Sequence, residues 1–357
     1  MIDRLLPTLT YREAGVDLEA AERFTDEVRT LAATTKTASL DVLPSQGGFA
    51  SLVGLPAGYV DPVIVASCDG VGTKLSLALA ANKPSLIGHD LVAMCLNDLV
   101  TTGARPLLFL DYLATDKIEG SALLEVVRGV AEACREAGCP LTGGETAEMP
   151  GLVLRGSLEI AGFAVGVVER AKLLSAARVR AGDVLVGVVT EGLHANGFSL
   201  VRRVLADHRL SLDDAPEELG KTLGEALLSP TPLYVAAARA LADLPGEHVH
   251  ALAHVTGGGL ERNVGRLLSG HLTAVIDATR LEAASSDGVI GLLARLGPIE
   301  RRELRRTFPL GVGFVAAVAP PGLAAACAAL ATLGKRTVVL GEVIPTADPL
   351  AQRVVFS

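Results

Sequence analysis

Asp69-Gly70-Val71-Gly72-Thr73-Lys74 follows the apolar run 62–66, and this junction of a strand with a glycine-bearing turn decides the interpretation of the fold. The run predicts a buried strand, and a helical stretch follows the turn. The turn combines a carboxylate, two glycines that let backbone N–H groups approach a ligand, a hydroxyl and a cation. This set suits a phosphate group with a divalent metal, although its spacing differs from a Walker loop and a plain tight turn is the alternative.

Further strands and helices are predicted on both sides of this turn. Apolar periodicity indicates strands at 62–66, 106–112, 157–168, 184–189, 250–255, 272–277, 311–318 and 336–343, and helices at 18–31, 87–102, 123–137 and 199–206. Strands interleaved with helices predict an α/β protein with mixed α+β sheets. The length of 357 residues favours two domains, which we place at 1–170, including an N-terminal extension at 1–58, and at 171–357.

The composition argues against several classes of protein. A formal net charge of −8 is unfavourable for nucleic-acid binding, because a polyanion is normally held by clustered Lys and Arg. Five cysteines without a Cys-x-x-Cys pair predict neither a disulfide framework nor a zinc site, and favour a cytoplasmic, reducing compartment. The N-terminus lacks a signal-peptide pattern, and Pro320 and Pro321 interrupt the most apolar stretch, so we expect no membrane span.

Acidic and amide side chains gather on one predicted helix and near two strand ends. Asp90 and Asn97 are seven positions apart, which places them about 20° apart on one helix face, with Asp98 beside them. Mg²⁺ prefers carboxylate, carbonyl and phosphate oxygens, so this face can supply ligands; helix capping or solvation is the alternative. Asp111 is a further acid in a predicted strand. The segment Gly143-Gly144-Glu145 adds another, where an apolar run is expected to pass through a glycine pair into a helix.

Three motifs together resemble those of the phosphoribosylformylglycinamidine cyclo-ligase family, also called aminoimidazole ribonucleotide synthetases. They are Asp69-Gly-Val-Gly-Thr-Lys74, Gly88-His-Asp-Leu-Val-Ala-Met-Cys-Leu-Asn-Asp-Leu-Val100 and Gly143-Gly-Glu-Thr-Ala-Glu-Met-Pro-Gly151. Segments at 11–17, 109–115, 161–166, 192–197, 253–259 and 306–313 resemble the same family in the same order. Each glycine motif alone is weak evidence, but the ordered set is specific. The chain departs from the family at Arg12, Cys68 and Ala195, where Lys, Thr and Ser are frequent.

The resemblance implies a two-domain α/β fold and a homodimer whose sheets meet across the subunit interface. It implies ATP and Mg²⁺ as cofactors of the N-terminal domain and a small phosphoribosyl compound as substrate. The family's reaction closes the imidazole ring of formylglycinamidine ribonucleotide in purine biosynthesis, giving 5-aminoimidazole ribonucleotide, ADP and phosphate. ATP first converts the formyl amide into an iminophosphate, and the amidine nitrogen of the same substrate then displaces phosphate while water is excluded.

Roles for individual residues follow from this resemblance. Assigned to ATP are Asp69, Gly70, Gly72, Thr73, Lys74, Asn97, Asp111, Gly143 and Gly144, and assigned to Mg²⁺ are Asp69, Asp90 and Glu145. Assigned to catalysis are Lys74, Asp98 and His194, and assigned to the substrate are His194, Asn196, His254, Thr256, Gly257 and Gly258. The turn after His254 would hold the ribose 5′-phosphate. For His194, a role in proton transfer or phosphate binding and a purely structural role are equally open.

Alternatives remain for the function and for one loop. Relatives with the same ATP-binding architecture include thiamine-monophosphate kinase, selenophosphate synthetase, hydrogenase-maturation proteins and formylglycinamidine ribonucleotide synthetase. The chain has no cysteine before Cys68 and ends without one, unlike two of these groups. A catalytically silent ATP-binding regulator is another alternative, which substrate-stimulated phosphate release would exclude. The Gly47-Gly48 pair suits a closing loop and a plain connector equally.

Overall fold

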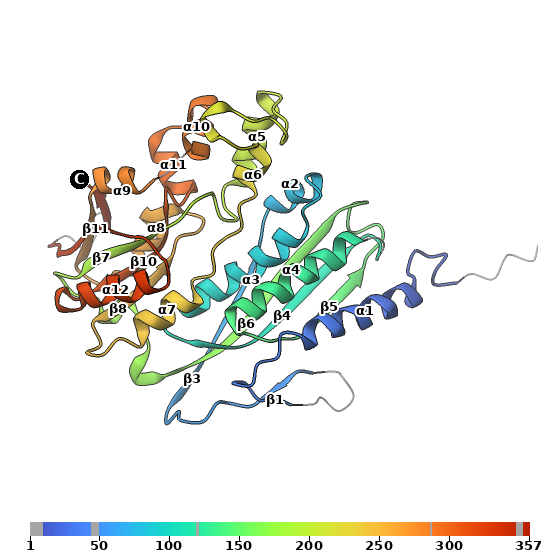
Figure 1. Ribbon diagram of the computed structural model, residues 1–357, viewed down its shortest axis with the longest axis horizontal. Coiled ribbons are helices and arrows are strands. Elements are labelled where there is room, and N and C mark those ends of the chain that lie inside the picture. The colour runs from blue at the N-terminus through green and yellow to red at the C-terminus, as the bar shows by residue number, and fades with distance from the viewer. Residues whose placement is uncertain (1–9, 44–49, 119–120, 286–287, 348–352) are drawn as a thin grey trace, which may run out of the picture.

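The computed structural model of the protein describes residues 10–43, 50–118, 121–285, 288–347 and 353–357. A four-stranded sheet comes from the first half of the chain and a six-stranded sheet from the second half, beside a two-stranded ribbon (Figure 1). Helix α3 lies between the two sheets and contacts both. The Gly47-Gly48 loop falls outside the described residues.

The N-terminal sheet has the strand order β3-β6-β4-β5. Its strands are β3 (Pro62–Gly70), β4 (Arg105–Thr115), β5 (Leu141–Glu148) and β6 (Leu158–Glu169), and the ribbon is β1 (Val42–Leu43) with β2 (Leu52–Val53). β6 is antiparallel to β3 and to β4, and β4 is parallel to β5. One row of register partners crosses all four strands, in the order Asp69, Gly162, Asp111, Gly144. Residues of one row point to the same face of a sheet.

Helices α3 and α4 cover one face of this sheet. The helices of this half are α1 (Leu18–Ala33), α2 (Lys74–Ala80), α3 (Ser85–Val100) and α4 (Ser121–Ala137). α3 and α4 cross so closely that a β-carbon at Gly88 would lie 1.9 Å from Val126 O, and one at Gly129 would lie 1.9 Å from Ser85 O. Two helix backbones approach this closely only where glycine stands at the crossing. α1 packs on this half of the chain, against α4.

The opposite face of the N-terminal sheet exposes large apolar side chains. Strand side chains alternate between the two faces, and those of the uncovered face include Ile64, 57% exposed, and Phe163, 40% exposed. Ala66 and Cys68 follow Ile64 at alternate positions on the same face. An apolar sheet face of this kind is typical of a surface that binds another protein.

The C-terminal sheet has the order β12-β9-β11-β7-β10-β8 and is antiparallel except between β12 and β9. Its strands are β7 (Val184–Val189), β8 (Val249–His254), β9 (Leu272–Ile276), β10 (Val312–Val318), β11 (Thr337–Pro345) and β12 (Val354–Phe356). The helices are α5 (Phe198–Asp207), α6 (Leu223–Leu227), α7 (Val235–Ala242), α8 (Gly259–Gly265), α9 (Ala278–Ala284), α10 (Gly288–Leu296), α11 (Arg301–Thr307) and α12 (Leu323–Thr332).

One hydrophobic cluster joins the two sheets. It contains Ile87 and Leu91 of α3, Ala164 of the N-terminal sheet, and Val186 and Phe314 of the C-terminal sheet. A second cluster lies on the other face of the C-terminal sheet, and a third lies beneath α5, α6 and α10. The two sheets therefore share a core, and α3 is its central element.

Every predicted strand and helix overlaps an observed one, but two predictions need correction. β3 extends to Gly70 instead of ending at residue 66, so Asp69 lies inside the strand. Residues 141–148 form β5 throughout, so the expected transition into a helix is wrong. β12 was not predicted. The limits 1–170 and 171–357 stay a prediction. No helix in the described part of the chain is both long and apolar enough to cross a membrane.

Candidate active site at the junction of the two sheets

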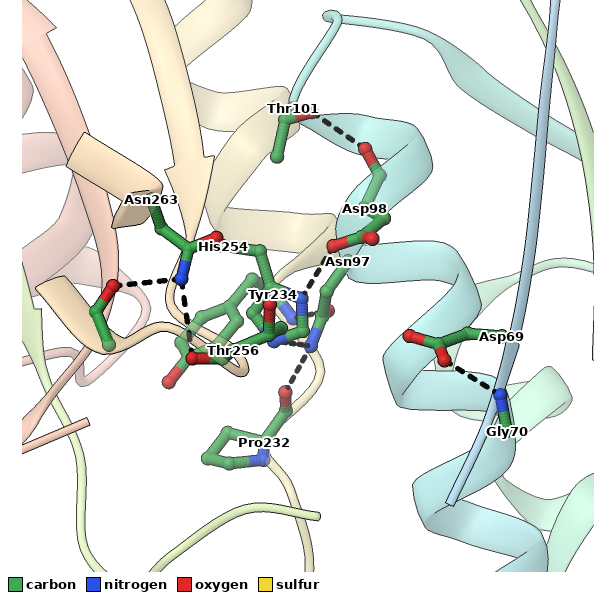
Figure 2. Close-up of polar contacts among 11 residues, drawn as sticks. Asp69, Gly70, Asn97, Asp98, Thr101, Pro232, Tyr234, His254, Thr256 and Asn263 are labelled. Atoms are coloured by element: carbon green, nitrogen blue, oxygen red, sulfur yellow. Dashed lines mark hydrogen bonds and ion pairs between the residues drawn. The ribbon is translucent and has the colours of Figure 1, made fainter. Parts of the chain in front are cut away.

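Two carboxylates lie near each other where β3 runs beside α3. The Asp69 Oδ1 accepts a hydrogen bond from the Gly70 N–H at 2.7 Å. Burial raises the pKa of Asp69 and the Asp98 carboxylate adds to this, while the Gly70 N–H and His254 act in the opposite direction. Figure 2 shows the Asp69 side chain directed toward the helix that carries Asn97 and Asp98. A divalent cation relieves repulsion of this kind between like charges.

A histidine from the C-terminal sheet holds Asp98. The His254 Nδ1 lies 2.8 Å from the Asp98 Oδ1 (Figure 2). The His254 side chain is buried, whereas that of Asp98 is 40% exposed. The His254 Nε2 lies 3.5 Å from the Asn97 Nδ2, which can only donate, so this contact assigns the ring proton to Nδ1. His254 thereby orients Asp98, as the outer partners of metal ligands do.

Asp90 and Asn97 share one face of α3, as predicted, but this face binds protein. The Asn97 Oδ1 accepts from the Tyr234 N–H at 2.7 Å, and its Nδ2 donates to Pro232 O at 2.9 Å. The Asp90 Oδ1 accepts from the Thr231 N–H at 2.6 Å. Both side chains are fully buried. The predicted periodicity is therefore confirmed, while its partner is a segment of the C-terminal half.

Lys74 is the buried partner of Asp90. Its Nζ lies 2.6 Å from the Asp90 Oδ2 and donates to Ser229 O at 2.7 Å, and neither charged side chain has exposed surface. Asp90 is thus the counter-ion of Lys74. Its assignment to Mg²⁺ stays a prediction, which this contact does not support. The same geometry does not support the assignment of Lys74 to ATP and catalysis, because its ammonium group points into the protein. Residues 229–234, which Lys74, Asp90 and Asn97 hold, are called the strap below.

Asp111 is buried inside the N-terminal sheet, and its assignment to ATP stays a prediction. Its side chain is 5% exposed and packs over Gly144, where a β-carbon would lie 1.8 Å from the Asp111 Oδ1. Burial raises the pKa of Asp111 to about 7. Its Oδ2 has no hydrogen-bond partner in the described part of the chain. Asp111 is therefore a buried acid inside the sheet, and Gly144 provides the space for it.

Glu145 lies three strands away from Asp69. Asp69 and Gly144 belong to one row, so the adjacent Glu145 points to the opposite face of the sheet. Within the described ranges, no three His, Cys, Asp or Glu side chains converge as a metal site requires. The three side chains assigned to Mg²⁺, those of Asp69, Asp90 and Glu145, lie apart in this structure, and their assignment stays a prediction. The assignment of Gly143 to ATP stays a prediction.

His194 is buried beneath the turn 192–197. It is 1% exposed, adopts a left-handed backbone with φ +56, and has its Nε2 3.0 Å from the Thr190 Oγ1. Burial, then the charges of His254 and Lys74, lowers its pKa well below the ordinary value, so the ring is neutral. Its Nδ1 has no partner among the described residues. Left-handed backbone at a non-glycine residue is typical of functional sites, yet this ring is closed off from a substrate.

Three turns predicted to bind ligands come together at the junction. Thr73, in the first turn, lies against α5, with its Oγ1 3.2 Å from the Ser199 Oγ. The second turn holds Asn196 and the third holds Gly257, and a β-carbon added to Gly257 would lie 3.7 Å from the Asn196 Oδ1. The first turn thus lies beside the start of α5, and the second turn lies beside the third. These three turns, which come from both halves of the chain, are called the rim below.

The third turn is braced from within the protein. The Asn263 Nδ2 donates to Thr256 O at 3.2 Å and to Gly259 O at 2.8 Å (Figure 2). Gly258 has a left-handed backbone with φ +97 and precedes α8. The turn formed by Thr256, Gly257 and Gly258 is thus rigid and lies beside His254. Their contact with a substrate stays a prediction.

Tyr234 and the strap were not predicted from the sequence. The Tyr234 ring stacks on Phe314 with centroids 4.9 Å apart, and lies 6.2 Å from His194 and 6.1 Å from His254. The signal was present as the alternating prolines Pro230 and Pro232, which favour an extended segment. Periodicity gives no indication of the surface on which such a segment lies.

Comparisons with known proteins agree with this architecture. The family model AIR synthase related protein, N-terminal domain, matches residues 56–168, and the corresponding C-terminal domain model matches 180–350. The chain is 48% identical over 351 residues to the phosphoribosylformylglycinamidine cyclo-ligase of Sorangium cellulosum (strain So ce56), covering 98% of this chain and 99% of the relative. It is 46% identical over 339 residues to the enzyme of that name from Anaeromyxobacter dehalogenans (strain 2CP-C), covering 94% and 96%.

Among solved structures, thiamine-monophosphate kinase from Stenotrophomonas maltophilia K279a is similar, with a TM-score of 0.66 at 21% identity over 93% of this chain and 95% of that one. At this identity the likeness concerns the fold alone. The sequence relatives carry the assignment further, because they match almost the whole chain at more than 40% identity. The motif resemblance is thereby confirmed, and the chain belongs to the phosphoribosylformylglycinamidine cyclo-ligase family.

Proposed function

We propose that this chain closes the imidazole ring of formylglycinamidine ribonucleotide, using ATP and giving 5-aminoimidazole ribonucleotide, ADP and phosphate. The named relatives support the reaction class. The observation that carries the proposal is the Asp69–Asp98 pair at the rim where three turns meet. Carboxylates and backbone N–H groups are the means by which proteins hold a metal-bound triphosphate.

Asp69 and Asp98 are the residues that would hold Mg²⁺. In this proposal Asp98 is a metal ligand instead of Asp90, which the sequence suggested. The Gly70 N–H engages one oxygen of Asp69, and His254 engages one oxygen of Asp98. Among the residues that the structure describes, the second oxygen of each carboxylate accepts no hydrogen bond. Two protein ligands suit Mg²⁺, which usually completes its shell with phosphate oxygens and water. When bound, the ion neutralises charge on the transferred phosphoryl group.

The C-terminal turns are the proposed substrate side. Thr256, Gly257 and Gly258 offer rigid backbone beside Asn196, which suits the ribose 5′-phosphate. His254 acts on Asp98, and His194 stays a neutral residue behind the rim. With ATP on the N-terminal turns, the formyl oxygen and the γ-phosphate would meet near Asp98, where proximity assists phosphoryl transfer and ring closure.

A homodimer is part of the proposal. The exposed apolar face with Ile64 and Phe163 supports it, since a second copy would bury both sheets against each other. All five cysteines are free, which suits the cytoplasm, where we place the enzyme.

Phosphate release with and without formylglycinamidine ribonucleotide tests the proposal. We expect release to depend on this substrate, and product absorbance to report 5-aminoimidazole ribonucleotide in equal amount. ATP binding without substrate-stimulated release would instead identify the silent regulator. Stimulation by a different phosphorylated substrate would point to another enzyme of the same fold.

A further inference from the structure

The strap is attached to the N-terminal half through its backbone. Its two prolines carry no N–H, and side chains of α2 and α3 pair with much of the remaining backbone. The contacts are Lys74 Nζ to Ser229 O (2.7 Å), His89 Nε2 to Thr231 O (3.0 Å), Thr231 N–H to Asp90 Oδ1 (2.6 Å), Asn97 Nδ2 to Pro232 O (2.9 Å) and Tyr234 N–H to Asn97 Oδ1 (2.7 Å). The segment is thus held at both ends and in the middle.

The Lys74–Asp90 pair is the charged centre of this attachment. The Lys74 ammonium is surrounded by the Asp90 carboxylate, Ser229 O and the Phe198 ring, whose centroid lies 5.5 Å from Nζ. The ammonium group has no exposed surface, and its donors are directed at these protein groups. A buried ion pair adds little net stability, because desolvation offsets the attraction, whereas loss of one partner leaves a costly buried charge. Such a pair is better suited to fixing a geometry.

The strap leads directly to the groups around the acid pair. It ends at Tyr234, whose ring lies between Phe314 and the two buried histidines. Two consecutive residues of α3 make these contacts: Asn97 binds the strap, and Asp98 binds His254. A displaced strap would therefore move His254 relative to Asp98 and separate the substrate turns from the nucleotide turns.

We propose that Lys74 and Asp90 are positioning residues that fix the strap on α2 and α3 and so align the two halves of the active site, without contact to the nucleotide. This role differs from the phosphate contact that the turn motif suggests for Lys74. The kinetic part of its test rests on the proposed ring closure; the remaining parts do not.

The experiment compares Lys74→Met, Asp90→Asn and the double variant. Methionine keeps an unbranched side chain, and asparagine keeps an acceptor for the Thr231 N–H. Each single change leaves one unpaired buried charge, and the double change removes both. We expect kcat to fall about 100-fold in each single variant through misalignment, and no further in the double variant. The Kd for a non-hydrolysable ATP analogue with Mg²⁺ should stay within about threefold. Lys83→Met, at an exposed lysine after α2, is the matched control and should behave as wild type.

Hydrogen exchange of peptides covering the strap gives a readout that needs no turnover. We expect exchange at Thr231 to accelerate at least about tenfold in all three variants, because its N–H partner is no longer held in place. Unchanged exchange would overturn the proposal. So would a nucleotide Kd raised tenfold by Lys74→Met and not by Asp90→Asn, since Lys74 would then bind phosphate.

A double variant whose loss equals the product of the single losses would also overturn the proposal, because the two residues would act independently. If a single variant fails to fold, the double variant, which carries no unpaired charge, still tests the proposal, because unchanged exchange at Thr231 in the double variant would overturn the positioning role. If the wild type shows no ring closure, the proposed function fails, while exchange and nucleotide affinity still test the positioning role.

Discussion

Asp98 and His254 come from opposite halves of the chain, and their hydrogen bond joins the halves beside Asp69. His254 is buried and Asp98 is partly exposed, so His254 orients the Asp98 carboxylate, and the carboxylate is accessible to a ligand. A buried residue that orients a ligating side chain by a hydrogen bond is common where a carboxylate binds a metal. It gives Asp98 a sharper role than its neighbours on α3, which face the strap.

Asp98→Asn should lower kcat for ring closure at least about 100-fold, because a neutral amide is a weak partner for a divalent cation at a charged transition state. Substrate-dependent phosphate release measures the effect. Asp213→Asn, at an exposed carboxylate outside the site, should leave kcat unchanged. Activity of Asp98→Asn within about threefold of wild type would contradict the role of Asp98.

Asp111→Asn should stabilise the protein at alkaline pH. The pKa of Asp111 is raised from 3.8 to about 7 by burial, so the folded protein binds this proton more tightly than the unfolded chain. The free energy of unfolding therefore falls as pH rises from about 4 to 7, by up to about 4 kcal/mol, and the loss persists above pH 7. Asparagine is neutral throughout and avoids it.

Urea denaturation at pH 5 and pH 8 measures this effect. The variant should exceed wild type clearly at pH 8 and much less at pH 5. Asp213→Asn again serves as the control. An equal difference at the two pH values would show that Asp111 does not titrate between them.

The residues of the site were predicted unevenly, for a physical reason. Helical periodicity placed Asp90 and Asn97 on one face, which the structure confirms, but it could not show that a protein segment occupies that face. Likewise, an acidic residue inside a predicted strand suggested a ligand-binding role for Asp111. In the structure its side chain fits inside the sheet, because Gly144 on the neighbouring strand leaves space for it. Asp69 and Asp98 came together only through the packing of α3 on β3, and sequence spacing does not encode that contact.

At the scale of elements, the crossing of α3 and α4 depends on two glycines. Gly129→Ala should destabilise the protein by about 3 kcal/mol, because the new methyl group would meet Ser85 O at 1.9 Å and force the helices apart. Gly265→Ala in α8 is the matched control, since its nearest neighbour would lie 3.8 Å away and alanine favours a helix. Chemical denaturation measures both, and equal stabilities would contradict the close crossing.

Glycine and polar residues explain two of the poorly predicted strands, β5 and β3. β5 contains one large apolar residue, Leu141, and its Gly143-Gly144 pair interrupts any alternation of apolar and polar residues, so the two threonines alone do not mark it as a strand. Its position is fixed by pairing with β4 and by the buried Asp111. β3 was predicted too short for a related reason, because its last residues are polar or glycine while still paired to β6.

At the scale of the whole molecule, the exposed sheet face predicts association. Phe163→Glu should convert the proposed homodimer to monomers, since charges would be buried at the centre of the interface. Leu333→Glu, at a residue of similar exposure after α12, should leave the oligomeric state unchanged. Sedimentation measures both variants. A wild-type monomer would contradict the homodimer.

The hydrophobic cluster that runs from Ala164 through α3 to Phe314 has a consequence for heat denaturation. Neither half can melt without exposing the side chains that the other half covers, so calorimetry should record a single endotherm for the wild-type chain. By the same reasoning, a fragment of residues 171–357 produced alone should be aggregation-prone, because the apolar surface that normally packs against α3 would be exposed to solvent.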